Sequence, residues 1–158
     1  MTLRGAALAV SVLALGALAP GALAEGYESK PEAAERDPDY AAGKKAIAEK
    51  SWKEAIARFE QAARRDPDNP DLQNWLGYSH RNLKEYDLAF THYKRAIELD
   101  PRHRGAHEYV GETYLLVGDL AGAAKHLAAL RDICLLPCDE LADLERAMAR
   151  YRNDPDAR

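Results

Sequence analysis

Residues 76–101 read LGYSHRNLKEYDLAFTHYKRAIELDP, and this stretch decides the fold because its pattern recurs every 34 residues. The recurring columns are Gly43, Gly77 and Gly111; Ala55, Ala89 and Ala123; Trp52, Tyr86 and Leu120; Phe59, Tyr93 and Leu127; and Ala62, Ala96 and Leu130. Several columns in one register indicate an internal repeat rather than a set of unrelated helices. The chain is therefore predicted to contain three copies of one structural unit.

Each unit is predicted to form two helices. In the second unit, the i, i+3, i+4, i+7 spacing of one helical face is followed by Leu72, Trp75, Leu76 and Ser79. A second apolar face runs from Tyr86 to Ile97, and Asp100-Pro101 ends it. Glycine and alanine columns mark positions where two helices approach closely, and the larger columns fill the space between units.

This pattern resembles the tetratricopeptide repeat (TPR) family. The clearest copy carries the resemblance in Leu76-Gly77, Tyr86, Ala89, Tyr93, Ala96 and Asp100-Pro101. The first copy departs from the family at Asp39 and Ala42, where large apolar residues are usual. The resemblance implies an all-α fold, an α-solenoid of three helix-turn-helix repeats at 36–69, 70–103 and 104–137.

Residues 1–24 are predicted to be a signal peptide. They contain one charged side chain, Arg4, followed by an apolar run and an Ala22-Leu23-Ala24 end. The run is shorter than the roughly 20 residues that span a bilayer, and no cysteine follows the expected cut, which argues against a membrane anchor and a lipoprotein. We expect the chain to be exported, with no membrane span after cleavage. It would be periplasmic in a Gram-negative bacterium and secreted otherwise. Residues 25–36 are expected to be a polar lead-in to the first repeat.

The repeat pattern stops at Cys134, and a last helix is expected at 138–152. Its apolar stripe would contain Leu141, Leu144, Met148 and Tyr151. Repeat arrays need a terminal element with a polar outer face, so this helix is predicted to cap the array. Residues 153–158 are expected to fray as a tail.

Cys134 and Cys138 stand on either side of a helix break at Pro137. An exported chain meets an oxidising compartment, which favours a disulfide that fixes the angle of the capping helix. Two alternatives stay open. The pair is also compatible with thiol-redox activity, and a Cys-x-x-x-Cys pair can bind Cu(I), although the sequence shows no further ligand at a diagnostic spacing.

The resemblance also implies a binding surface. In the family, the first helix of each pair lines a concave groove that receives an extended peptide or a partner helix. The register assigns to this groove the residues Tyr40, Lys44, Asn74, Trp75, Tyr78, Arg81, Asn82, Glu108, Tyr109 and Glu112. The alternative is that Trp75 and Tyr109 only pack and that the charges form a solvated helix face.

The chemistry of the assigned residues favours a protein partner. Aromatic side chains supply contact area of the kind found at binding hot spots, and asparagines can pair with a peptide backbone. Lys44 and Arg81 are expected to form a positive end, and Glu108 and Glu112 a negative end. Relatives that grip a carboxyl-terminal peptide use clustered Lys, Arg and Asn, so these two glutamates argue against a carboxylate clamp.

Composition and motifs exclude other classes of function. With 22 Lys+Arg against 26 Asp+Glu in 158 residues, the net charge is −4, which argues against a nucleic-acid partner. No phosphate-binding loop, nucleophile elbow or metalloprotease motif is present, so the chain is not expected to be an enzyme. His103 and His107 have zinc-like spacing but no third ligand, and neither a metal nor a cofactor is expected. A structural subunit with its groove filled by residues 25–36 remains a weaker option.

Overall fold

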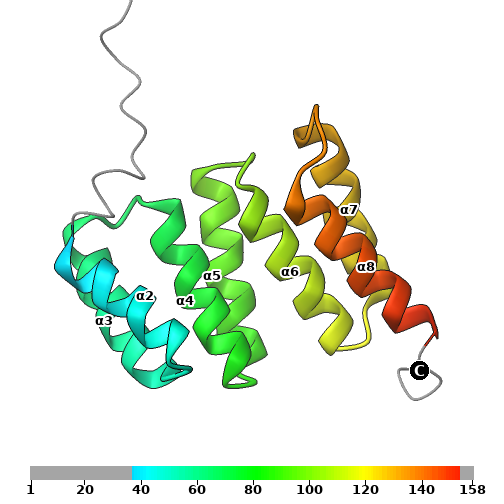
Figure 1. The fold of residues 1–158 in the computed structure, drawn as a ribbon. Coiled ribbons are helices and arrows are strands. Elements are labelled where there is room, and N and C mark those ends of the chain that lie inside the picture. The colour runs from blue at the N-terminus through cyan, green and yellow to red at the C-terminus, as the bar shows by residue number, and fades with distance from the viewer. Residues whose placement is uncertain (1–36, 154–158) are drawn as a thin grey trace, which may run out of the picture.

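The computed structural model describes residues 37–153, which form seven α-helices and, within that range, no strand (Figure 1). The helices are α2 (Pro38–Ala48), α3 (Trp52–Arg65), α4 (Pro70–Asn82), α5 (Tyr86–Leu99), α6 (Arg104–Leu116), α7 (Leu120–Ile133) and α8 (Asp139–Asn153). The all-α solenoid expected from the sequence is confirmed. The predicted signal peptide, the lead-in and residues 154–158 lie outside the described residues.

The helices form two layers. Figure 1 shows α2, α4, α6 and α8 in one layer and α3, α5 and α7 behind them. Each first helix contacts the second helix of its own unit, and each second helix contacts the first helix of the next unit. Helix α8 contacts both α6 and α7, so it occupies the place that the first helix of a fourth unit would take.

The period seen in the sequence is also the period of the structure. The second helices begin at Trp52, Tyr86 and Leu120, and they end at Arg65, Leu99 and Ile133, always 34 residues apart. The turn before each second helix contains one residue with positive φ at the same repeat position: Lys50 (57°), Lys84 (63°) and Gly118 (81°). Only the third copy uses glycine, which adopts this conformation without steric cost.

The glycine column lies where a side chain packs closely against the helix backbone. A Cβ atom added to Gly77 would lie 2.7 Å from the ring of Tyr93, which is fully buried. In the third unit, the corresponding contact is made by the capping helix: a Cβ atom on Gly111 would lie 2.6 Å from Leu144 Cδ2. Carbon atoms prefer about 3.5–4.0 Å. The column therefore allows contact within a unit and, in the third unit, contact with α8.

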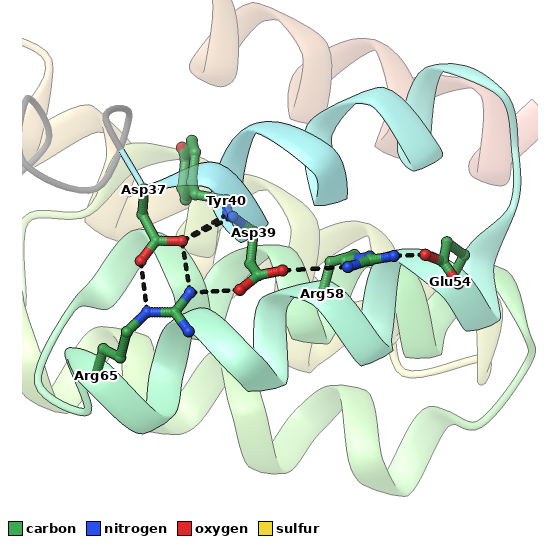
Figure 2. Close-up of polar contacts among 6 residues, drawn as sticks. All are labelled: Asp37, Asp39, Tyr40, Glu54, Arg58 and Arg65. Carbon is green, nitrogen blue, oxygen red and sulfur yellow. Dashed lines mark hydrogen bonds and ion pairs between the residues drawn. The ribbon is translucent and has the colours of Figure 1, made fainter.

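The first unit is held by an ion-pair network where its sequence departs from the family. Figure 2 shows Arg65 of α3 between the carboxylates of Asp37 and Asp39, with bonds of 2.6–2.8 Å. Asp39 also receives a bond of 3.3 Å from Arg58, which in turn pairs with Glu54 at 2.7 Å. Asp39 thus joins α2 to α3 through charge instead of through an apolar contact.

Asp37 has a second role in this network. Its side chain caps α2 by accepting hydrogen bonds from the backbone N–H groups of Asp39 and Tyr40 at 2.8 and 3.2 Å. Hydrogen bonding from Arg65 lowers the pKa of Asp37 to about 2. Because Tyr40 begins the predicted groove, the cap also fixes where that surface starts.

Candidate functional site

An aromatic cluster lies on the first-helix layer, at positions that the repeat register assigned to the groove. The ring centroids of Tyr78 and Tyr109 are 4.9 Å apart, and Trp75 lies 5.8 Å from Tyr78 and 6.2 Å from Tyr109. Trp75 Nε1 donates a hydrogen bond of 3.1 Å to the hydroxyl of Tyr40. The structure therefore brings together aromatic residues from α2, α4 and α6.

Cationic side chains cover this cluster. Lys44 Nζ lies 3.4 Å from the centroid of the Trp75 ring. The Arg81 guanidinium carbon lies 5.1 Å from the Tyr78 ring and 5.5 Å from the Tyr109 ring. These distances are those of cation–π contacts, which stabilise the positions of both partners.

The predicted separation of charge along the groove is wrong at Arg81 and Glu112. These residues were expected at opposite ends, but Arg81 Nη1 donates a hydrogen bond of 2.5 Å to Glu112 Oε2. The reason is geometric: Arg81 is in the last turn of α4, and α6 lies beside α4, so the long arginine side chain reaches across the helix pair. The pair is locally neutral.

The two asparagines of the predicted groove have different surroundings. Asn82 Nδ2 donates a hydrogen bond of 2.8 Å to the backbone oxygen of Tyr78, so its amide nitrogen is already used. Asn74 is only 3% exposed, and its Oδ1 has no hydrogen-bond partner within residues 37–153. A buried acceptor without a donor is costly to folding, and because this oxygen is enclosed, Asn74 is not a ligand contact in this structure.

Glu108 occupies the same repeat position one unit later. It is only 9% exposed, and burial raises its pKa to about 8, with further contributions from Glu112, Asp143 and Glu140. No hydrogen bond or ion pair to Glu108 occurs in the described part of the chain. The neighbouring Tyr109 hydroxyl also has a pKa raised by burial, to about 12.

An open cavity of about 460 Å³ lies at the C-terminal ends of α4, α6 and α8, with Lys84 and Tyr86 also in its lining. Arg81 connects it to the aromatic cluster, because Arg81 lines the cavity and lies over the rings of Tyr78 and Tyr109. Its walls include Leu115, Leu116 and Tyr151, and its polar lining includes Arg81 and Glu112. Leu116 is 57% exposed, although it is a large apolar side chain. The cavity thus combines accessible apolar surface with polar groups, as ligand sites commonly do.

Residues of α8 in this cavity were missed by sequence reasoning, which assigned α8 only a capping role. They are Ala147, Arg150 and Tyr151. The signal was present, because a helix that replaces the first helix of a fourth unit must also continue the face of the first-helix layer. Tyr151 shows both roles, since it packs against the buried cluster around Leu144 and also lines the cavity.

The cysteine pair lies between α7 and α8. The Cα atoms of Cys134 and Cys138 are 6.1 Å apart, within the range that a disulfide needs. Helix α7 ends at Ile133 and α8 begins at Asp139, so the pair spans the helix break expected at Pro137. This placement fits a clip that limits the angle between the two helices.

The histidines occur in separate pairs. His107 Nδ1 and His126 Nδ1 are 3.0 Å apart, whereas His103 Nε2 lies 3.0 Å from Asp71 Oδ1. His103 therefore does not join His107, despite their spacing in the sequence. Among residues 37–153, no group of three His, Cys, Asp or Glu side chains could hold a metal ion. In the same part of the chain, no helix has the length and apolar character needed to cross a bilayer.

Comparison with known proteins agrees with this architecture. The sequence matches the family described as tetratricopeptide repeat over residues 40–103 and 91–134. A solved structure, the TPR2B domain of yeast Sti1 in complex with pHsp70, is similar with a TM-score of 0.62 and 18% identity, covering 72% of this chain and 95% of that one. No curated protein matches the sequence. At this identity, the likeness to the solved structure shows the fold alone.

Proposed function

Because the chain belongs to the tetratricopeptide repeat family, we propose that it is a non-enzymatic protein-interaction module that binds a peptide segment or a partner helix. The binding surface is the first-helix face, which we define as the aromatic cluster of Trp75, Tyr78 and Tyr109 together with the adjoining cavity between α4, α6 and α8. The observation that carries the proposal is that Arg81 joins the clustered aromatic rings to this open cavity.

The side chains on this face support a peptide ligand. Rigid aromatic rings provide contact area at a low cost in conformational entropy and are enriched at binding hot spots. The exposed Leu116 offers a docking point for an apolar side chain of the ligand. The solved complex of the Sti1 domain with pHsp70 supports only the capacity of this fold to hold a partner, so the chemistry of the ligand is argued from this chain.

The charges on the face argue against a ligand with a free carboxylate at the centre. Arg81 is already neutralised by Glu112, and burial disfavours the charged form of Glu108 beside it. A carboxylate placed there would lose its hydration without gaining an unpaired cation at Arg81, which raises the cost of binding. The preferred ligand is therefore an internal segment of a partner chain.

The experiment selects a ligand from a random-peptide display library by panning on the wild-type protein. The affinity of the selected peptide is then measured for wild type, for Leu116→Asp and for the matched control Leu88→Asp, which alters a residue of α5 that is 48% exposed. We expect Leu116→Asp to weaken binding by about tenfold or more, since losing a hot-spot contact costs over about 1.4 kcal/mol, and Leu88→Asp to leave it unchanged. Equal affinity of both variants, or a library that converges on no motif, would overturn the proposal.

We also propose that the chain is exported and that Cys134 and Cys138 form a disulfide in the exported protein. The pattern at residues 1–24 supports export, and the positions of the two cysteines are compatible with a bond in an oxidising compartment. The test is an intact mass and a thiol titration of native exported protein. A mass that begins at Glu25 and the absence of titratable thiols are expected; two free thiols would favour the redox or copper-binding alternative.

A further inference from the structure

Glu108 differs from every other carboxylate around it. Glu112 pairs with Arg81 at 2.5 Å, Glu140 pairs with Arg104 at 3.7 Å, and Asp143 pairs with Arg146. Glu108 is more buried than these residues, and within residues 37–153 its carboxyl group has no hydrogen bond or ion pair. Burial without a partner disfavours the charged form, so the pKa of Glu108 is raised to about 8. A cationic group placed beside it would favour the charged form.

The groups that face Glu108 come from all three helices of the cavity. Glu112 lies one turn further along α6, Glu140 and Asp143 come from α8, and Arg81 comes from α4. Three of these four groups are carboxylates, and Arg81 is already bonded to Glu112. The local field therefore favours an added positive charge.

The carboxyl oxygens of Glu108 are not among the fully enclosed unpaired atoms of the described residues, which are Asn74 Oδ1 and Tyr93 Oη, so a ligand can reach them. A ligand group suited to Glu108 must bring hydrogen-bond donors as well as positive charge. A guanidinium group supplies both, with five N–H donors.

We propose that Glu108 receives the arginine side chain of a partner peptide bound along the first-helix face. This inference rests on the proposed function and specifies its ligand. A metal ion is the poorer candidate, because the described residues contain no group of three His, Cys, Asp or Glu side chains placed to hold one. A guanidinium needs no such convergent set, since a single carboxylate can pair with it in a bidentate manner.

The test pans the random-peptide library separately on wild type, on Glu108→Gln and on Glu98→Gln. Glu98 is a matched control because it is exposed on α5. We expect arginine to be enriched at one fixed position in the wild-type and Glu98→Gln pools and not in the Glu108→Gln pool. A motif without arginine in the wild-type pool, or arginine enrichment that survives Glu108→Gln, overturns the inference and leaves the proposed function standing. A wild-type pool without any motif overturns both.

A second measurement guards against a folding defect in the variant. The selected peptide is compared with one in which citrulline, the neutral isostere, replaces the arginine. Wild type should lose about tenfold in affinity or more, while Glu108→Gln should bind both peptides alike. Circular dichroism of the variant must show wild-type helicity, and equal affinity of wild type for both peptides would contradict the assignment.

The pH dependence adds a signature that a merely structural role would not produce. Below its raised pKa, Glu108 in the free protein holds a proton that a cationic ligand must displace. Wild-type affinity for the arginine peptide should therefore rise from about pH 6 to about pH 9, and the rise should be absent in Glu108→Gln. An identical profile in the variant would show that a different group titrates and would count against Glu108.

Discussion

The contact between Gly111 and Leu144 allows the capping role of α8 to be tested by exchanging the sizes of two side chains. Leu144 is fully buried, and a Cβ atom on Gly111 would lie 2.6 Å from its Cδ2 and 2.9 Å from its Cδ1. The perturbation is the set Gly111→Ala, Leu144→Ala and the double variant. If α8 completes the array through this contact, each single change should be harmful and the second change should partly repair the first.

The structure sets the expected magnitudes. Leu144→Ala should lower the free energy of unfolding by about 3–5 kcal/mol, as truncation of a fully buried leucine does. Gly111→Ala forces an overlap that costs about 1–3 kcal/mol, offset by about 1 kcal/mol of improved helix propensity. In the double variant the added methyl enters the space that Leu144 leaves. The two changes should therefore couple favourably by about 1–3 kcal/mol.

Urea unfolding followed by circular dichroism measures these free energies. The control pair is Gly77→Ala with Leu144→Ala, because a Cβ atom on Gly77 would contact Tyr93 instead of Leu144. Effects in this control pair should add within about 0.5 kcal/mol, as they do for sites that share no contact. Additive effects in the Gly111 pair as well would refute the packing of α8 against α6 and, with it, the boundary of the cavity.

Three further predictions concern the turns, the histidines and the cysteine pair. Lys84→Gly should raise the free energy of unfolding by about 1 kcal/mol, and Gly118→Ala should lower it by a similar amount, because both positions have positive φ. Urea melts in which Lys84→Gly lowers this free energy or Gly118→Ala raises it would contradict the turn geometry. Burial lowers the pKa of His92 and of His126 from 6.5 to about 4. Between these two pH values the unfolded chain binds more protons than the folded chain. The free energy of unfolding should therefore fall as the pH drops from 6.5 towards 4. His126→Gln should make this fall shallower in urea melts at each pH, and an unchanged slope would rule out its burial as a neutral side chain. Reducing the Cys134–Cys138 bond should cost about 2 kcal/mol on the chain-entropy relation for so short a loop; an unaltered melting curve with dithiothreitol would show that the bond does not restrain α8.

Much of the fold was predictable because the repeat constrains it. The repeat position occupied by Trp52, Tyr86 and Leu120 is also the first residue of α3, α5 and α7. The role of Asp39 was not predictable in the same way. A single aspartate in an apolar column reads as a weakened repeat until Arg58 and Arg65 are seen to approach it from α3.

The site was less predictable than the fold, for a physical reason. The register of the repeat assigns residues to a face of the solenoid, but it does not determine which charged side chains on that face form ion pairs. Arg81 and Glu112 are 31 residues apart, and their ion pair depends on the reach of one side chain across α4 and α6. The acidic surroundings of Glu108 include Glu140 and Asp143 of α8. Because α8 does not follow the repeat, the register could not place these residues.

The proposed binding face can be tested most directly by a nitrogen-15 NMR titration of the protein with the peptide selected by panning. We predict that the largest chemical-shift changes occur at the Trp75 indole N–H and at the backbone amides of Arg81, Glu112 and Leu116, on α4 and α6 of the first-helix face. The backbone amides of the outer layer, which consists of α3, α5 and α7, should keep their chemical shifts; Arg58 and Arg95 are examples. Saturable changes confined to the outer layer would contradict the account.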